Sequence, residues 1–271
     1  MKRLLSIELQ KIWQNRASRV LTLTYFILLS SIALISSINF KFVGVDFRLA
    51  DMGIYNFPFI WHFNTFIASQ FKLFLAIIIV SMMANEYSNG TLKQNLIDGL
   101  NKREFIMSKF LTVVLFALAS TAYLFIITLI LGYSFSSYNE TEIVFMDLEY
   151  LFAYFLKLVG FFSFCLFLGI LVKRSAFALG FLFVWFIFEF VLIYMVRIPK
   201  TIYDFLPLES MYRLISQPFT RFKLYQTLES QVSGATQVRD YEVHLSTILT
   251  VMAWIVIFML MSYKILKKRD L

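Results

Sequence analysis

The chain has 271 residues, of which 59% are hydrophobic, 18% aromatic and only 15% charged, and its net charge is +8. A soluble domain carries about 25% charged residues, so this composition excludes a water-soluble protein. The apolar runs reach about 20 residues, the length of a helix that crosses a bilayer, and stretches such as residues 73–80 lack the alternation of barrel strands. The single cysteine, Cys165, excludes an intrachain disulfide and is expected to be a packing residue. The composition predicts a polytopic helical membrane protein.

Residues 3–18 are predicted to form an amphipathic helix at the cytoplasmic membrane surface. Apolar side chains recur at helical spacing at Leu5, Leu9, Ile12 and Trp13. Polar residues occupy another face at Glu8, Lys11 and Asn15. A simple surface anchor and a docking site for a partner fit this pattern equally well.

Six apolar segments then predict an all-α membrane domain that covers the whole chain, 1–271. The expected spans are 20–38, 63–84, 105–133, 148–172, 176–196 and 245–263. An even number of spans places both termini on one side. The segments on that side carry about twice as many Lys and Arg residues as the opposite side, which predicts cytoplasmic termini. The first span is expected to stay as an anchor rather than to be removed as a signal sequence.

The connection between the second and third spans, residues 85–104, is predicted to hold a short cytoplasmic helix. Thr91 followed by Gln94 fits a capping box, and Gly90 and Gly99 bracket the segment as a pivot and a stop. The helix would have one apolar stripe, made of Leu92, Leu96 and Leu100. A second capping box, Asn101 with Glu104, is predicted where the third span begins. By itself this pattern also fits an ordinary capped connector.

The stretch 197–244, between the fifth and sixth spans, is too long for a simple turn. Prolines punctuate it at Pro199, Pro207 and Pro218. Within it, residues 205–215 mix apolar side chains with Glu209 and Arg213. Short helices that dip partly into the membrane, or an external cap, are expected here; a floppy loop is the alternative.

Three charged residues, Lys72, Lys157 and Glu189, fall inside the predicted spans. Counted from the inner ends of their helices, all three lie at about the same depth, just beyond the midplane. A charge at that depth requires a partner, a water-filled path or, for lysine, snorkelling to the surface. The sequence leaves open an ion pair of Glu189 with either lysine, snorkelling lysines, and direct handling of substrate or protons.

Motifs for catalysis are missing. The chain has no Gly-x-x-x-x-Gly-Lys-[Ser/Thr] phosphate loop, so we expect it to lack ATPase activity of its own and to bind no cofactor. His62 and His244 lie far apart and belong to no zinc motif, so both are expected at the outer ends of spans and no metal site is predicted. We expect no catalytic residue in this chain.

The order of these features resembles the type-2 ABC transporter permease, the membrane subunit of many bacterial ATP-driven exporters. The resemblance covers the basic N-terminal helix, the six spans, the segment after the second span and the long outer loop. The matching residues are Glu86, Tyr87, Gly90, Thr91 and Leu92, followed by Arg103, Glu104, Phe105 and Lys109.

The resemblance implies that residues 91–100 are a coupling helix in a groove of a separate cassette ATPase. The residues implied in this coupling are Glu86, Tyr87, Gly90, Thr91, Leu92, Gln94, Leu96, Leu100, Arg103 and Glu104. It further implies two partner ATPase subunits that bind ATP and Mg²⁺, and a second permease chain that is identical to this one or different. Membrane lipid is a further implied partner, and nucleic acid is not. The implied location is the bacterial inner (plasma) membrane. The cargo is not determined by these residues.

Two other classes of function compete with transport. The chain could be a membrane anchor or assembly protein whose loop docks a partner that is not an ATPase. It could also be an integral-membrane enzyme that acts through Glu189 and Lys157.

Overall fold

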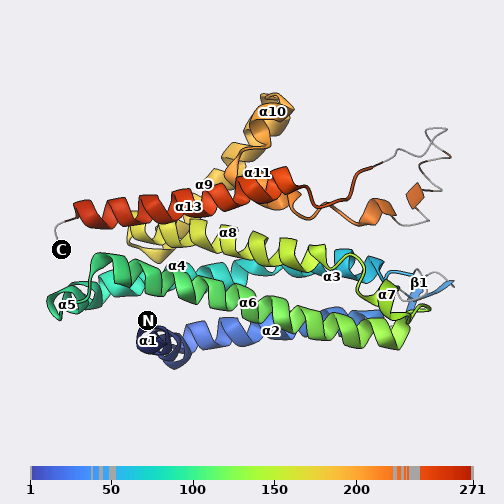
Figure 1. Ribbon diagram of the computed structural model, residues 1–271, viewed down its shortest axis with the longest axis horizontal. Helices are drawn as coiled ribbons and strands as arrows, with labels where there is room; N and C mark the ends of the chain where they lie inside the picture. The colour runs from blue at the N-terminus through green and yellow to red at the C-terminus, as the bar shows by residue number, and fades with distance from the viewer. Residues whose placement is uncertain are drawn as a thin grey trace.

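The computed structural model describes residues 2–37, 39–42, 45–48, 53–221, 225–226, 229, 231 and 239–269, without the side chains of residues 2 and 33–48. This part of the chain is almost entirely helical (Figure 1). One antiparallel hairpin joins β1, Asn39–Phe42, to β2, Val45–Arg48, with Phe42 opposite Val45.

Four stretches of the described chain are long and apolar enough to cross a membrane. They are α6 (Lys102–Phe135), α7 (Thr141–Val144) together with α8 (Glu149–Val172), α9 (Ser175–Phe190) together with the π-helical η2 (Val191–Met195), and α13 (Leu245–Lys268). A fifth is present if α3 (Phe59–Gln70) and α4 (Lys72–Ser88) are counted as one bent span. The helical, membrane-type fold is thereby confirmed, while six spans and the side on which the termini lie stay predictions.

The first predicted span, 20–38, overlaps α2, a helix of 22 residues at Arg16–Ser37, and residue 38 lies outside the described residues. α2 is not among the helices that are long and apolar enough to cross a membrane, so this span stays a prediction. The second, expected as one helix over 63–84, is instead broken. The helices α3 and α4 meet at an angle of 44°, and Phe71 lies between them. The run of apolar residues predicts burial equally well for a straight and a bent helix, so periodicity could not reveal the break.

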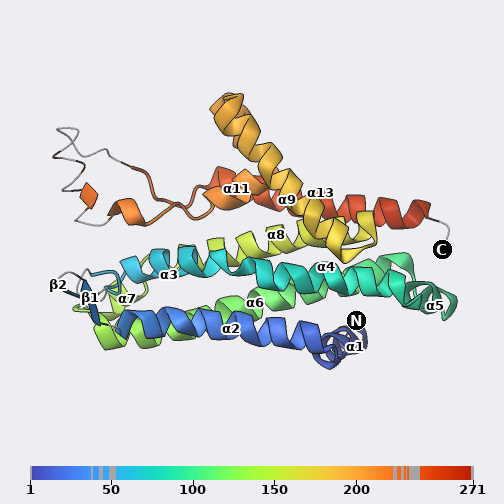
Figure 2. The ribbon, with the colours of Figure 1, turned by 180° about the vertical axis from the view of Figure 1, so that it is seen from behind.

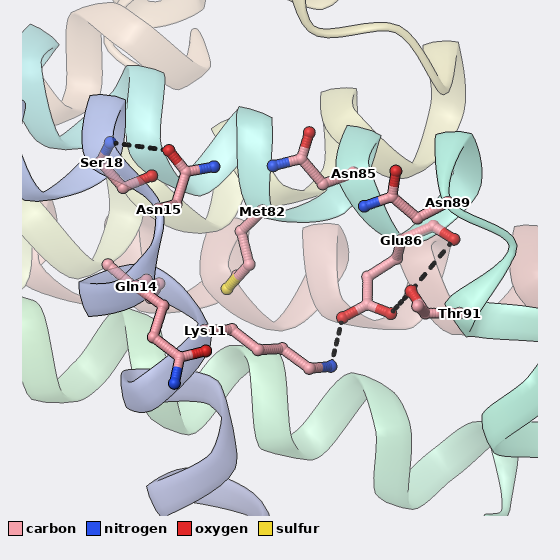
Figure 3. A pocket seen from close by; sticks show the side chains of 10 residues that line it. Lys11, Gln14, Asn15, Ser18, Met82, Asn85, Glu86, Asn89 and Thr91 are labelled. Carbon is pink, nitrogen blue, oxygen red and sulfur yellow. Dashed lines mark hydrogen bonds and ion pairs between the residues drawn. The ribbon is translucent and has the colours of Figure 1, made fainter.

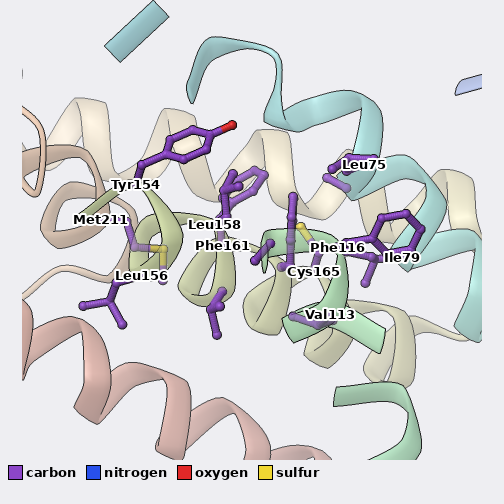
Figure 4. Close-up of a cluster of buried hydrophobic side chains, with 14 of the residues drawn as sticks. Leu75, Ile79, Val113, Phe116, Tyr154, Leu156, Leu158, Phe161, Cys165 and Met211 are labelled. Carbon is purple, nitrogen blue, oxygen red and sulfur yellow. The ribbon is translucent and has the colours of Figure 1, made fainter. Parts of the chain in front are cut away.

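The core is built around α8, which packs against α3, α4, α6, α9, α11 and α13. Close packing requires glycine at two points on α8. A Cβ at Gly169 would lie 3.0 Å from Cβ of Met83 on α4, and one at Gly160 would lie 3.0 Å from Cγ1 of Val251 on α13. Figure 4 shows part of this core, with Cys165 of α8 buried near Leu75 and Ile79 of α4.

The two ends of the bundle differ. α1 (Lys2–Gln14), α5 (Thr91–Ile97) and the last turn of α13 lie together at one end, while the hairpin and α7 lie at the other (Figures 1 and 2). Arg269, just after α13, donates to the carbonyl oxygens of Ile170 at 2.5 Å and Leu171 at 2.8 Å. The end of α13 is therefore tied to the end of α8.

The segment 197–221 contains the short helices predicted from its sequence. α10 spans Lys200–Tyr203 and α11 spans Pro207–Arg213, with Pro207 in its first turn. α11 packs against α8, α9 and α13, whereas α9 leaves the bundle and carries α10 at its far end (Figure 2). In this stretch α11 is thus folded onto the bundle, whereas α10 projects away from it.

Candidate functional site

α5 is a short, bracketed helix at the end of the bundle. Gly90 precedes it with a left-handed backbone at φ +67°, and Gly99 follows it at φ +98°. Glycine adopts these angles without the steric cost that a Cβ brings. The two glycines bracket the helix as predicted, while the role of Gly90 as a pivot stays a prediction. The helix itself is one turn shorter than the predicted 91–100.

The predicted capping box of Thr91 with Gln94 is wrong. Gly90 occupies the N-cap position, so Thr91 is the first helical residue, and its hydroxyl donates to Oε2 of Glu86 at 2.5 Å. The second box is confirmed: Asn101 caps α6, and its backbone N–H donates to Glu104 at 3.2 Å.

The faces of α5 are sharply divided. Leu92 is buried, and Leu96 packs against the core with Leu100, as the predicted stripe requires. The opposite face presents Lys93, Gln94 and Ile97. Ile97 is 74% exposed, more than any other large apolar side chain in the described part of the chain.

A buried ion network lies directly behind α5. Lys109 of α6 donates to Glu86 of α4 at 2.6 Å and to Glu8 of α1 at 2.5 Å. Lys11, one turn after Glu8, donates to the same Glu86 oxygen at 2.8 Å and approaches Glu8 at 3.4 Å. Two carboxylates and two ammonium groups therefore join the three helices α1, α4 and α6, and Thr91 connects α5 as a fourth helix.

Burial makes each charge of this network depend on its partners. The Lys109 side chain is 0% exposed, and those of Glu8 and Glu86 are 6% and 4% exposed. An isolated charge at such a position costs several kcal/mol, so each member depends on the others. The ammonium of Lys109 also lies 5.0 Å from the centroid of the Phe105 ring. The network holds α1, α4, α5 and α6 in one fixed arrangement.

Lys11 lies at the rim of the network. Burial lowers the pKa of its ammonium, but the hydrogen bond to Glu86 and the negative charges of Glu8 and Glu86 outweigh burial and raise the pKa above the usual value of 10.5. Lys11 is therefore a cation at neutral pH. With Lys109, it balances the two negative charges of Glu8 and Glu86.

The orientation of α1 differs from the expectation that its apolar stripe and polar face are cleanly separated. Glu8 and Ile12 turn toward the bundle and are buried, while Leu9 and Trp13 are exposed. This rotation brings Glu8 against Lys109 of α6. The exposed Leu9 and Trp13 then form an apolar strip on the outer side of α1.

A cavity of about 250 Å³ opens between α1 and α4, beside the network. Figure 3 shows Lys11 and Glu86 joined across it, with the amide side chains of Gln14, Asn85 and Asn89 around its edge. The lining lies next to α5 and combines polar side chains with the apolar residues Ile12 and Met82, so it offers a docked group both hydrogen bonds and apolar contact.

Tyr87 connects this region to the C-terminal end of α13. Its hydroxyl accepts a hydrogen bond from Arg269 at 2.9 Å, and its ring lies under the cations of Lys173 and Arg269. Lys102, at the start of α6, donates to the carbonyl oxygen of Arg269 at 3.0 Å. The residues of the predicted coupling segment thus contact α1, α6, α8 and the end of α13, while Arg103 is exposed beside them.

Sequence reasoning missed several members of this site. Glu8 and Lys11 were placed on a polar face, but their spacing gave no sign that the face turns inward. The sequence marks Arg269 only as one basic residue among several near the C-terminal end, and Ile97 lies outside the leucine stripe. The signal available for Ile97 was an isoleucine on the polar side of a short capped helix.

The charged residues within the predicted spans do not join this site, and the ion pair of Glu189, one of the alternatives that the sequence leaves open, does not form. Within the described chain, no salt bridge joins Glu189 to Lys72 or Lys157. The Glu189 carboxylate instead accepts hydrogen bonds from Trp185 and from the backbone N–H groups of Leu208 and Glu209. It therefore caps the first turn of α11.

At the opposite end, His62 lies in the first turn of α3 and is fully buried, while its predicted place on the outer side stays a prediction. It hydrogen-bonds the carbonyl oxygen of Ser216 at 2.8 Å, stacks on Tyr150 at 4.3 Å and contacts Arg221. These contacts fix the segment that contains Ser216 and Arg221 on α3 and α8. His244 lies just before α13 and contacts Asp240 at 3.0 Å. Across the residues that the structure describes, no group of three or more His, Cys, Asp or Glu side chains is placed to hold a metal ion.

Comparison with known proteins gives one family. The model of the family described as protein of unknown function (DUF2705) matches residues 20–271. No curated protein matches the chain.

Proposed function

Because the chain belongs to DUF2705, a family whose description assigns no activity, we propose a function from its own geometry: it is the membrane-spanning permease subunit of an ATP-driven ABC exporter. ATP and Mg²⁺ bind two separate cytoplasmic ATPase subunits, and a second permease chain completes the transporter. In a bacterium the complex lies in the inner (plasma) membrane.

The observation that carries this proposal is the combination of an exposed helix with a rigid support. α5 projects an apolar side chain, Ile97, away from the bundle, while Thr91 and Glu86 tie its other end to a buried ion network. A partner that docks on a braced helix moves the bundle with it, and the exposed isoleucine offers such a partner an apolar contact.

The mechanism follows from that support. When the ATPase subunits close on ATP, they displace α5. The network passes this displacement to α1, α4 and α6 together, because separating any one of them leaves a buried charge without its partner. α4 and α6 in turn pack on α8, so movement of α5 changes the packing at the centre of the bundle. Such coupling is the requirement for alternating access.

In the proposed topology, α2, the bent pair α3 and α4, α6, α8, α9 and α13 are the six spans. α1, α5 and the end of α13 face the cytoplasm, where the short loops carry most of the Lys and Arg residues. α10 and α11 lie on the outer side, with α11 dipping into the membrane.

The decisive experiment uses tagged, full-length chain solubilised mildly from its native membrane, followed by mass spectrometry of co-purified proteins. The test variant is Ile97→Asp, which places a charge at the docking face. Ile202→Asp is the matched control, because Ile202 is also an exposed isoleucine but lies on α10, far from α5.

The proposal expects a phosphate-loop ATPase with the wild type and with Ile202→Asp, and its loss with Ile97→Asp. The recovered ATPase, recombined with the wild-type chain in proteoliposomes, should hydrolyse ATP faster than it does alone. A partner without a phosphate loop that is lost with Ile97→Asp would overturn the transporter and favour the anchor or assembly protein.

A further inference from the structure

The cavity between α1 and α4 has an inner part and a mouth of different chemistry. Its inner part is made of buried side chains, those of Ile12 on α1, Ser18 on α2 and Met82 on α4. Its mouth is made of exposed carboxamides, those of Gln14, Asn85 and Asn89 (Figure 3). A group that enters the cavity therefore meets polar side chains first and apolar side chains farther in.

Most of the polar lining has hydrogen-bonding capacity that the described part of the chain does not use. The carboxamides of Asn85 and Asn89 form no hydrogen bond there, and the oxygen of Asn15 accepts one from the backbone N–H of Ser18 at 3.2 Å. The hydroxyl of Ser18 has no partner among the described residues, although Ser18 is only 7% exposed. Because a buried hydroxyl normally has a partner, Ser18 marks the inner part of the cavity as a place for a hydrogen-bonding group.

The charged groups beside the cavity balance one another. Lys11 and Glu86 belong to the lining and are bonded to each other at 2.8 Å. Lys109 and Glu8 complete the same network with one charge of each sign. Both oxygens of Glu86 already accept hydrogen bonds, one from the two lysines and the other from Thr91. A charged ligand finds no excess of the opposite charge here, so the lining favours an uncharged one.

The size and position of the cavity indicate where its ligand comes from. Its volume is about 250 Å³. That is less than the roughly 300–1,000 Å³ of pockets that enclose a drug-sized molecule, and it suits one large side chain. Thr91, the first residue of α5, forms part of the wall, so the cavity adjoins the helix that exposes Ile97. A protein that docks on α5 therefore lies within reach of the cavity.

We propose that the cavity receives one uncharged side chain of the cytoplasmic protein that docks on α5. This side chain has an apolar stem, which contacts Ile12 and Met82, and a hydrogen-bonding end, which reaches the hydroxyl of Ser18, as tyrosine or glutamine would. The carboxamides at the mouth bind the adjoining main chain of the partner, because a carboxamide offers one donor group and one acceptor group, as a peptide group does. The inference rests on the docking role of α5 in the proposed function, but it does not require that the partner is an ATPase.

The first test locates the partner by crosslinking. The photoreactive residue p-benzoylphenylalanine replaces either Gln14 on α1 or Asn89 on α4, and the full-length chain is irradiated in its native membrane. Both positions should crosslink to the same short segment of one protein, and adding Ile97→Asp should abolish both crosslinks. The control position is Asn139, which is exposed just before α7 at the other end of the bundle and should not react with that protein. Absence of a crosslink from both cavity positions, or crosslinks to lipid alone, would overturn the inference.

The second test measures the affinity of the crosslinked protein, once purified, for the full-length chain in detergent. Asn85→Leu, Asn89→Leu and Ser18→Ala each remove a hydrogen-bonding group without changing the charge, and each should weaken binding about three- to tenfold. Asn139→Leu is the matched control and should bind as the wild type does. If Ile97→Asp abolishes binding while all three cavity variants bind normally, the inference is overturned and the proposed function stands.

Charged substitutions at Asn85 decide the chemistry of the inserted side chain. Asn85→Asp and Asn85→Lys should both weaken binding, because an uncharged side chain gains nothing from a charge of either sign. Tighter binding with Asn85→Asp would reveal a cationic side chain, and tighter binding with Asn85→Lys an anionic one; either result would overturn the inference. A partner that depends on the cavity but has no phosphate loop would support the inference and overturn the transporter.

Discussion

Lys109 of α6 donates to Glu86 of α4 across 2.6 Å, and the lysine side chain is fully enclosed. The same ammonium reaches Glu8 of α1, so one lysine joins three helices that are far apart in the sequence. This arrangement converts a local connector, α5, into a part of the bundle that cannot move independently of α1, α4 and α6.

Removing Lys109 should destabilise the protein strongly. Lys109→Met leaves the carboxylates of Glu8 and Glu86 buried with only the partly exposed Lys11 nearby, and loss of one partner of a buried pair costs about 3–5 kcal/mol. Thermal unfolding in detergent should show a large decrease in midpoint for this variant. Lys93→Met, an exposed change on α5, should leave the midpoint nearly unchanged.

The triple variant Glu8→Gln/Glu86→Gln/Lys109→Met should recover much of that loss, because no uncompensated charge then remains in the core. If the decrease in midpoint of the triple variant equals the sum of the decreases of the three single variants, the network does not act as a unit.

Gly90 should tolerate asparagine better than valine. A Cβ at this position meets no other atom within 4 Å, so the penalty is confined to the left-handed backbone, which costs a β-branched residue about 1–2 kcal/mol and asparagine less. In the co-purification assay, Gly90→Val should reduce recovery of the partner more than Gly90→Asn. Equal recovery with both would show that the backbone turn does not position α5.

Gly169→Val should disturb the contact between α8 and α4. Its Cβ would lie 3.0 Å from Cβ of Met83 and 3.4 Å from the carbonyl oxygen of Val80, so the helices must separate, at a cost of about 1–3 kcal/mol. Gly180→Val is the control, since a Cβ at Gly180 on α9 meets nothing within 4 Å. Thermal unfolding of the two variants should differ clearly, and similar midpoints would contradict the tight α4–α8 packing.

Glu189→Leu should loosen α11 without involving Lys157. The change leaves the backbone N–H groups of Leu208 and Glu209 without an acceptor, which costs about 1–3 kcal/mol. Limited trypsin digestion should then cut more rapidly at Arg213, and Glu142→Leu, at an exposed residue of α7, should leave the rate unchanged.

A double variant, Glu189→Leu/Lys157→Met, tests the same point differently. Because the two residues form no salt bridge, the losses of the single variants should add. Recovery of stability in the double variant would show that a pair forms in solution.

The sequence by itself determined the class of fold and the local turns. Runs of apolar residues require helices in a membrane, because only a helix satisfies its backbone hydrogen bonds within one segment. Gly90, Gly99 and the Asn101–Glu104 box mark the limits of α5 and the start of α6, since these signals act over a few residues of backbone. The resemblance pointed to Glu86, Thr91 and Lys109 as one region, but it gave no reason for their chemistry.

Only the tertiary structure decided how charges that are distant in the chain meet. Glu8 and Lys109 become partners because α1 rotates its polar face inward, and Glu189 serves α11 because that helix folds back beside α9. Lys72, at the start of α4, meets the ring of Phe161 on α8. A pattern along the chain records spacing within a helix, whereas these pairings depend on the rotation, bend and depth of helices against one another, which packing of the whole bundle sets.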